Sequence, residues 1–203
     1  MPASIRPYRA GDREDVYEIC VRTGAAGQDA RGRYSNDDLL GDIYAGAYLY
    51  IAPEHAFVLD NGERAVGYVI GTPSTREFVA AYRTTWLPRL RGVYEPPAGT
   101  PSTEEERKLA DLFSPEEMLR PELAAHPAHL HINLLPGYQG AGYGRKLVST
   151  FLASVAAVGA MSCYLAVRAA NTGALAFYDK LGWRRIDVTD PGASVYLFRA
   201  TAG

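Results

Sequence analysis

The sequence predicts a mixed α/β fold, and three observations support this prediction. Two segments near the amino terminus carry apolar residues at helical spacing. A β-hairpin pattern follows them around Asn61-Gly62. From residue 129 onward, strand and helix patterns alternate, with a strand, a glycine-rich loop and a helix at the centre of this region.

Length and composition are those of an ordinary globular protein. The chain has 203 residues, which suits one domain with a single hydrophobic core. Apolar residues make up 47% and charged residues 22%, which excludes disorder as the main state. The 21 basic and 23 acidic residues leave a net charge of −2 without a basic run for nucleic acid. We therefore predict one domain over residues 1–203 that binds no nucleic acid.

The sequence also lacks the usual signals for membranes and for metals. No stretch approaches the roughly 20 consecutive apolar residues of a membrane span, and the amino terminus has no apolar signal core. Cys20 and Cys163 fit no zinc or disulfide framework, and we expect both to be buried and inert. We expect a cytoplasmic protein with no membrane association and no metal.

The amino-terminal third predicts a short strand, two helices and a hairpin. Residues 5–8 are extended, after which Asp12 is expected to cap a helix that ends at Gly24. Ser35 or Asn36 is expected to cap the second helix. The apolar positions of these two helices are Val16, Ile19, Cys20, Thr23, Leu39, Leu40, Ile43 and Tyr44. Residues 56–59 and 65–70 then form the hairpin strands.

Residues 73–127 differ in character from their surroundings. Helical patterns at 78–90 and 104–113 are interrupted by seven prolines, so neither a long helix nor a central strand is expected there. We interpret the segment as one helical, proline-rich insertion within the domain.

The last third predicts alternating elements. Residues 129–135 form a strand, 142–158 a helix, 163–167 a buried strand and 172–180 a short helix. Two closing strands at 184–188 and 194–198 flank a turn at 190–192.

Glycines 140, 142 and 144 lie between the strand and the helix of this region. They remove side chains from the loop, and the following helix points its amino terminus at whatever lies there, which favours a phosphate or pyrophosphate. The loop lacks the Gly-Lys-Ser/Thr ending of a Walker loop. Gln139 stands where a dinucleotide fingerprint would have its first glycine. A turn softened by glycine remains the alternative.

Two hallmarks identify the sequence as similar to the GCN5-related N-acetyltransferase (GNAT) superfamily. Gln139-Gly140-Ala141-Gly142-Tyr143-Gly144 matches the signature Gln/Arg-x-x-Gly-x-Gly/Ala. Asn171, followed by Phe177-Tyr178-Asp179-Lys180-Leu181-Gly182-Trp183, resembles the second hallmark. The resemblance implies the GNAT fold, a mixed and mostly antiparallel sheet flanked by helices, with the insertion between strands 3 and 4.

A closer resemblance is to the acetyltransferase-like carboxy-terminal domain of animal O-GlcNAcase and its free-standing bacterial relatives. It is carried by residues 5–8 and 15–20, the Trp86-Leu87-Pro88 segment and residues 177–182. The animal domain is regarded as a pseudo-acetyltransferase because its cofactor loop has degenerated, whereas this sequence keeps the full loop.

The superfamily resemblance implies acetyl-CoA as cofactor. The strand before the loop would splay from its neighbour so that the backbones of Leu134 and Leu135 bond pantetheine. For Asn171, a helix cap is an equal alternative to a cofactor contact. The implied cofactor-binding residues are Leu134, Leu135, Gln139, Gly140, Ala141, Gly142, Tyr143, Gly144, Arg145, Asn171, Phe177, Tyr178 and Lys180.

Three residues are candidates for catalysis. Tyr178 matches the usual general acid toward the departing thiolate, with a packing role as the alternative. His129 and His131 alternate along a strand and so face one side, like a His-x-His pair in serotonin N-acetyltransferases that helps to deprotonate the amine. We predict His131 as the base, titrating near roughly 6.5, with His129 as relay; a structural histidine pair is the alternative.

The resemblance implies acetyl transfer to an amine, which could be a protein lysine, a small amine or an amino sugar. Aromatic residues of the insertion are expected to form part of the wall on the acceptor side, namely Phe78, Tyr82, Trp86 and Tyr94. The alternative is that they fasten the insertion to the sheet. The rival function is a catalytically silent acetyl-CoA-binding module that acts through a protein partner. The sequence leaves a homodimer open.

Overall fold

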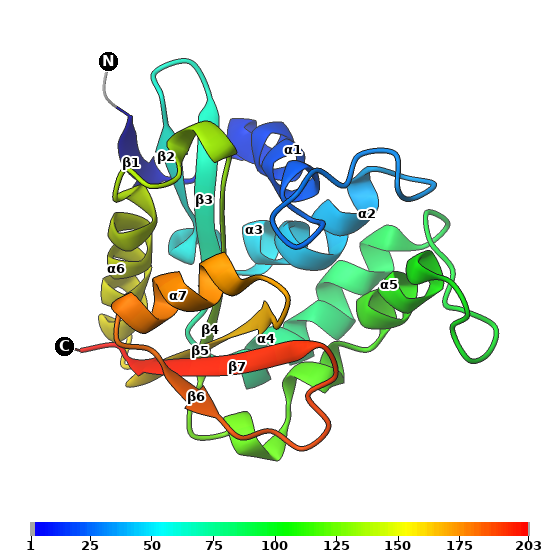
Figure 1. Cartoon of the computed structure of the whole chain (residues 1–203). Coiled ribbons are helices and arrows are strands. Elements are labelled where there is room, and N and C mark those ends of the chain that lie inside the picture. The colour runs from blue at the N-terminus through cyan, green and yellow to red at the C-terminus, as the bar shows by residue number, and fades with distance from the viewer. Residues whose placement is uncertain (1–2, 203) are drawn as a thin grey trace.

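A seven-stranded sheet in the order β1-β2-β3-β4-β5-β7-β6 runs through the molecule (Figure 1). The computed structural model describes residues 3–202. The strands are β1 (Ser4–Pro7), β2 (Phe57–Asp60), β3 (Ala65–Thr72), β4 (Ala128–Leu134), β5 (Ser162–Arg168), β6 (Arg184–Ile186) and β7 (Ser194–Ala200). All neighbours pair antiparallel except β4 and β5, which confirms the predicted mixed and mostly antiparallel sheet.

The parallel pair of β4 and β5 is short. Its register consists of Ala128 opposite Cys163 and His129 opposite Tyr164. Beyond these residues β4 continues to Leu134 on its β3 side only. The two central strands therefore part in the middle of the sheet, as the superfamily resemblance implied.

Helices cover both faces of the sheet. They are α1 (Arg13–Arg22), α2 (Asp38–Gly41), α3 (Ala47–Ile51), α4 (Thr75–Ala81), α5 (Glu104–Phe113), α6 (Tyr143–Ala156) and α7 (Thr172–Lys180). Helix α6 packs on β2, β3 and β4, and α1 and α3 lie on the opposite side of β3 (Figure 1). Within residues 3–202, none of the helices has the length and apolarity needed to cross a membrane.

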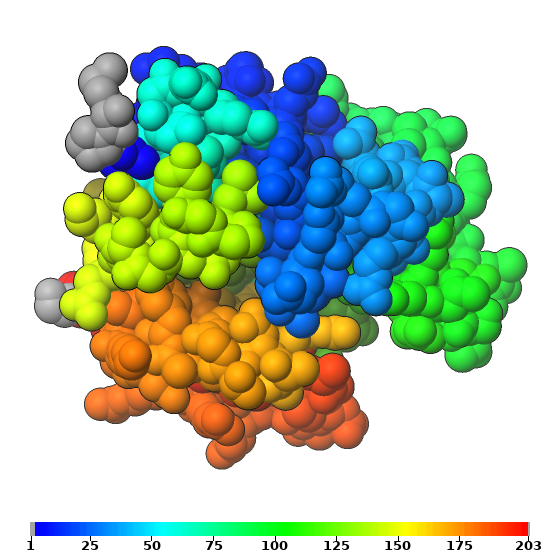
Figure 2. All heavy atoms as spheres, turned by 45° about the horizontal axis from the view of Figure 1, so that its top comes forward, coloured from blue at the N-terminus to red at the C-terminus, as the bar shows by residue number. Residues whose placement is uncertain are grey.

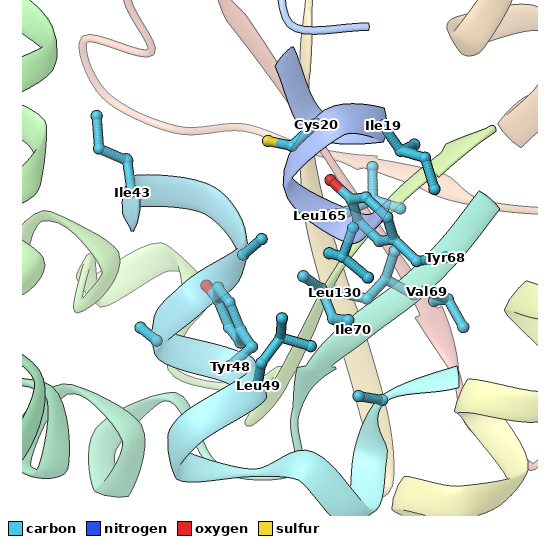
Figure 3. Close-up of a cluster of buried hydrophobic side chains, with 14 of the residues drawn as sticks. Ile19, Cys20, Ile43, Tyr48, Leu49, Tyr68, Val69, Ile70, Leu130 and Leu165 are labelled. Carbon is cyan, nitrogen blue, oxygen red and sulfur yellow. The ribbon is translucent and has the colours of Figure 1, made fainter. Parts of the chain in front are cut away.

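The core lies on both faces of the sheet, under α6 and under the helices of the amino-terminal half. Figure 3 shows Tyr68 of β3 and Tyr48 of α3 near Ile70, Leu130 and Leu165. Burial of such apolar surface is the main stabilising term in folding. Two polar tips enter this core, and both are bonded. The Tyr68 hydroxyl accepts from the amide of Asn133 at 2.7 Å, and the Tyr48 hydroxyl lies 2.6 Å from Nε2 of His129.

The amino-terminal helices differ in detail from the prediction. Helix α1 begins after Asp12, but the Asp12 carboxylate accepts from the Arg6 guanidinium at 2.7 Å instead of capping the helix. This pairing lowers the pKa of Asp12 below its ordinary value. Near the second helix, the side chain of Asn36 accepts from the N–H of Asp38, and one helical stretch continues through a π turn (Asp42–Gly46) into α3.

The insertion lies between β3 and β4, as predicted, and docks on the π turn. The backbone carbonyl of Asp42 accepts from Trp86 Nε1 at 3.1 Å. Its buried carboxylate accepts from the hydroxyls of Tyr17 at 2.6 Å and Tyr94 at 2.9 Å. Burial raises the pKa of Asp42 because it disfavours the charged carboxylate. The hydrogen bonds from the two hydroxyls offset part of this cost. Asp42 thus joins α1, the π turn and the insertion.

Replacing Asp42 by alanine is expected to destabilise the protein by about 2–6 kcal/mol, because two buried hydroxyls lose their acceptor at about 1–3 kcal/mol each. Chemical denaturation measures this change. Asp38→Ala is the control, since Asp38 is an exposed residue of the same helical stretch and its loss should fall within about 0.5 kcal/mol. Equal stability of the two variants would show that Asp42 does not stabilise the contact between α1, the π turn and the insertion.

Candidate functional site

A cavity of about 590 Å³ opens where α7 approaches the glycine loop and the segment after α1. We call it the α7 cavity. Figure 2 shows these three segments meeting on one face of the molecule, α7 in orange, the loop before α6 in yellow-green and the segment after α1 in blue. Its lining includes ten of the thirteen predicted cofactor residues: Leu134, Gln139, Gly140, Gly142, Gly144, Arg145, Asn171, Phe177, Tyr178 and Lys180.

The glycine loop is free of side chains at Gly140 and Gly142, as the sequence predicted. Gly140 and Gly142 have φ of +78° and +83°, the left-handed region that L side chains rarely adopt. Nothing lies within 4 Å of where their Cβ atoms would stand, so both glycines face open space. Gly142 is also the residue before α6, which has 14 residues and carries Arg145 in its first turn. The loop therefore directs unpaired N–H groups and a cation at the cavity.

The end of β4 offers a backbone edge to the same cavity. The N–H of Leu135 donates to the Val66 carbonyl at 3.0 Å, on the β3 side. Because successive residues of an antiparallel ladder point their N–H groups to opposite edges, the N–H of Leu134 points toward β5, where pairing has ended. The Leu135 carbonyl accepts from Tyr138 at 2.9 Å. Both backbone groups of Leu135 are therefore used within the protein, so Leu134 alone retains the predicted backbone role.

Two amide side chains have structural bonds at the cavity. Asn171 accepts from the N–H of Ala174 at 3.1 Å and so caps α7, which was one of its two predicted roles, while it also lines the cavity. Gln139 donates from Nε2 to the Leu134 carbonyl at 2.9 Å. This bond ties the glycine loop to the end of β4. Ala141 and Tyr143, also predicted as cofactor residues, are absent from the lining.

Tyr178 lies in the wall of the α7 cavity. Its ring packs edge-on against Phe177 and Trp183, with centroids 5.1 and 5.5 Å apart. Burial raises the pKa of the phenol above its ordinary value, so it stays protonated at neutral pH. No side chain or backbone group among residues 3–202 forms a hydrogen bond with its hydroxyl. Both predicted roles, packing and proton donation, are therefore compatible with its position.

A second cavity, of about 240 Å³, lies where β4 and β5 part, beside residues 129–131 of β4. We call it the insertion cavity. Leu130 and His131 of β4 face Leu165 and Ala166 of β5 across it. Its remaining lining comes from the helical stretch of the π turn and α3, from the insertion and from β4, β5 and β7: Ile43, Tyr44, Tyr48, Tyr82, Asp111, Ser114, Pro115, Glu117, Met118, Leu123, His129, Tyr164 and Tyr196.

The two histidines share a face, as their spacing predicted, and both meet Tyr48. The Tyr48 hydroxyl lies 2.6 Å from Nε2 of His129 and 3.1 Å from Nε2 of His131. Burial lowers the pKa of His129 well below its usual range and that of His131 to about 4. The predicted titration near 6.5 is therefore wrong, since the enclosed ring disfavours the imidazolium.

The structure separates the predicted catalytic residues. Both histidines line the insertion cavity and Tyr178 lines the α7 cavity. The next residues of β4, from Ile132 to Leu134, line the α7 cavity. A group that entered along the open edge of β4 would pass from one cavity toward the other.

Only one of the four predicted acceptor-side aromatics lines the insertion cavity. Tyr82 does so. Phe78 is fully buried and stacks on Tyr48 at 4.3 Å, behind the cavity wall. Trp86 and Tyr94 are bonded to Asp42 and fasten the insertion to the π turn. These three residues follow the alternative role, in which the aromatics fasten the insertion, while the start of the proline-rich segment after α5 lines the cavity.

Sequence reasoning missed several lining residues. Thr23, Ala26, Gly27 and Gln28 close the α7 cavity from the segment after α1. Left-handed φ values at Ala26 (+53°) and Gly27 (+92°) fold this segment over the cavity. Its small residues were the available signal, but their partner, α7, lies far away in sequence. Among residues 3–202, no cluster of three metal-ligating side chains occurs.

Comparison with curated proteins connects the chain to acetyltransferases. The model of the acetyltransferase (GNAT) family matches residues 113–183. Protein O-GlcNAcase of Rattus norvegicus is 28% identical over 181 residues, which are 88% of this chain and 20% of the relative. The chain therefore spans about a fifth of the length of the curated relative, and the predicted resemblance is confirmed.

Solved structures show the same fold. The crystal structure of SsHAT is 48% identical, with a TM-score of 0.96 and a match that covers 100% of both chains. The structure of yncA from Salmonella typhimurium with its cofactor acetyl-CoA is 14% identical, with a TM-score of 0.56, over 99% of this chain and 95% of that one. At that identity the second likeness concerns the fold alone.

Proposed function

Because this chain belongs to the acetyltransferase (GNAT) family, we propose that it is an N-acetyltransferase that moves an acetyl group directly from acetyl-CoA to an amine. The observation that carries the proposal is the open edge of β4 at Leu134, which ends in a left-handed glycine loop and the first turn of α6. Solved relatives that contain acetyl-CoA support the choice of cofactor.

The residues of the α7 cavity fit acetyl-CoA. The N–H groups after Gly140 and Gly142, the start of α6 and Arg145 suit a pyrophosphate. The free edge at Leu134 suits the amides of pantetheine, and the volume of about 590 Å³ is within the usual range of ligand pockets. When bound, acetyl-CoA would supply an acyl group activated as a thioester. Gln139 holds the loop against β4 and so keeps these donors in place.

In this proposal, His131 accepts a proton from the attacking nitrogen. Its pKa of about 4 is roughly 6 units below that of an alkylammonium, a difference worth about 8 kcal/mol, so it cannot deprotonate the free ammonium ion. The amine therefore arrives neutral. As the nitrogen attacks the acetyl carbon it gains positive charge, and a nearby neutral imidazole can then take its proton. The Tyr178 phenol, kept neutral by burial, would protonate the departing thiolate.

The insertion cavity is the proposed place of the acceptor. It lies beside His131 on the side of β4 away from α6, and Asp111 and Glu117 stand in its lining. We propose a primary amine there; a protein lysine, a small amine and an amino sugar are all acceptors that the experiments must compare. The silent binding module is the outcome in which acetyl-CoA binds but no amine is acetylated.

Millimolar acetyl-CoA is expected to raise the melting temperature of the wild-type protein, since a ligand at one hundred times its Kd stabilises the folded state by about 2.7 kcal/mol. Gly142→Asp should abolish this rise, because Asp tolerates a left-handed φ but places a negative charge against the pyrophosphate. Differential scanning fluorimetry measures both shifts.

Two variants control this experiment. Gly142→Asn adds the same bulk without the charge and should keep part of the rise. Gly159→Asp introduces aspartate at another left-handed glycine, with φ of +93°, beyond the far end of α6, and should keep all of it. A full response of Gly142→Asp to acetyl-CoA would place the pyrophosphate elsewhere.

A further inference from the structure

A chain of hydrogen bonds runs from the end of the insertion to His131. Thr75 Oγ1 donates to the Pro127 carbonyl at 2.9 Å and lies 2.7 Å from Nδ1 of His129. On the other side of that ring, Tyr48 bridges the Nε2 atoms of both histidines, as described above. Among residues 3–202, Nδ1 of His131 has no hydrogen-bond partner. This chain of hydrogen bonds thus ends at the Pro127 carbonyl on one side, its closed end, and at Nδ1 of His131 on the other, its open end.

The carbonyl sets the direction of every bond in the chain. It can only accept, so when the single hydroxyl hydrogen of Thr75 points toward Pro127, Thr75 Oγ1 accepts from Nδ1–H of His129. Burial keeps each imidazole neutral, with one N–H per ring. Nε2 of His129, a stronger acceptor than the Met118 sulfur at 3.9 Å, then accepts from the Tyr48 hydroxyl at 2.6 Å, and the Tyr48 oxygen accepts from Nε2–H of His131.

The opposite direction forms one bond fewer. If Thr75 donated to His129, the Thr75–Pro127 hydroxyl bond would be lost, and the remaining bonds would reverse so that His131 carried its hydrogen on Nδ1. A lost hydrogen bond in a buried site is costly because no water replaces it. The observed distances therefore favour the direction that leaves the lone pair of His131 on Nδ1.

We propose that Thr75 and Tyr48 are positioning residues that hold His131 in its Nε2–H tautomer, so that Nδ1 is the atom that receives the proton. The proton-accepting part of this inference rests on the proposed function, whereas the tautomer does not. The closed end also changes the predicted role of His129. A chain that ends at a carbonyl gives a proton no exit, so His129 orients His131 and does not relay its proton to solvent.

Nitrogen NMR of protein labelled with ¹⁵N-histidine at neutral pH tests the tautomers without any substrate. The wild-type protein should show opposite tautomers two residues apart, Nδ1–H for His129 and Nε2–H for His131. His129→Gln and His131→Gln assign the signals by their disappearance. The same tautomer in both rings, or Nδ1–H in His131, would overturn the proposal.

Thr75→Val tests the direction of the chain, because valine has the shape of threonine without its hydroxyl. His129 would then avoid a buried N–H without an acceptor by moving its hydrogen to Nε2, and Tyr48 would donate to His131. His131, which Thr75 does not bond, should therefore switch to Nδ1–H. Thr75→Ser keeps a hydroxyl and should keep the wild-type pattern. An unchanged His131 in Thr75→Val would show that Thr75 does not set the tautomer.

Turnover separates this inference from the proposed function. With an amine that the wild-type protein acetylates, Thr75→Val should lower kcat at least about tenfold without raising the KM for acetyl-CoA. Thr75→Ser should keep the kcat of the wild-type protein. If the tautomers switch but kcat does not change, His131 is not the base. If no amine is acetylated by the wild-type protein, the proposed function fails while the NMR result still decides the tautomer.

Discussion

Replacing His131 by glutamine is expected to lower kcat by about 10²–10⁴-fold, the usual cost of losing a general base. Glutamine is close in size and can still donate to the Tyr48 oxygen, so the core around Tyr48 should remain. The affinity for acetyl-CoA should change little, since His131 lies in the insertion cavity and not in the α7 cavity. Steady-state kinetics and the thermal shift with acetyl-CoA measure the two effects separately.

The pH dependence of this variant tests the buried environment. The ratio of wild-type to variant kcat/KM cancels the ionisation of the amine. Because the pKa of His131 is about 4 and the base works when neutral, the ratio should be flat at neutral pH and fall only as the pH drops toward that value. His126→Gln is the control, since His126 bonds Ser162 outside both cavities. A ratio that falls near a pH of roughly 6.5 would contradict the burial argument. If His131→Gln kept the turnover of the wild-type protein, water would be the group that removes the proton.

Replacing Tyr178 by phenylalanine is expected to lower kcat by about 10²-fold or more, because the thiolate of CoA would leave without a proton. The protein should fold normally, since the Tyr178 hydroxyl has no hydrogen-bond partner within residues 3–202 and its ring packing is kept. Acetyl-CoA should still raise the melting temperature, because phenylalanine keeps the ring that packs against Phe177 and Trp183 in the cavity wall. Kinetics at saturating acetyl-CoA measure the loss.

A matched substitution controls the Tyr178 result. Tyr8→Phe removes a phenol hydroxyl just after β1, away from both cavities, and should leave kcat unchanged. If the kcat of Tyr178→Phe equalled that of Tyr8→Phe, Tyr178 would have a packing role only, and water would protonate the thiolate.

Local patterns predicted the parts of the molecule that depend on local chemistry. The hairpin at Asn61-Gly62 formed because Gly62 adopts a φ of +99° at no steric cost. The loop before α6 formed for the same reason at Gly140 and Gly142. Ten predicted cofactor residues meet in one cavity because the two hallmarks lie on adjacent elements, where Gly144 allows Phe177 to approach: a Cβ there would lie 3.1 Å from the ring.

Features that depend on partners in other elements of the fold were not predicted. Asp12 was assigned as a cap from its position, but Arg6 on β1 offered a stronger, charged partner. Trp86 and Tyr94 were assigned to the acceptor side because they are aromatic, but Asp42 binds them both. The pKa of His131 followed from enclosure by other segments, which no pattern on β4 records.

Release of CoA thiol across a panel of amines, measured beside the thermal shift with acetyl-CoA, tests the central claim most directly. The panel contains lysine peptides, small alkylamines and amino sugars. The proposed function predicts that acetyl-CoA raises the melting temperature and that at least one amine releases CoA, with one acetylated amine formed per thiol. A thermal shift without amine-dependent release from any acceptor would contradict acetyl transfer and leave an acetyl-CoA-binding module.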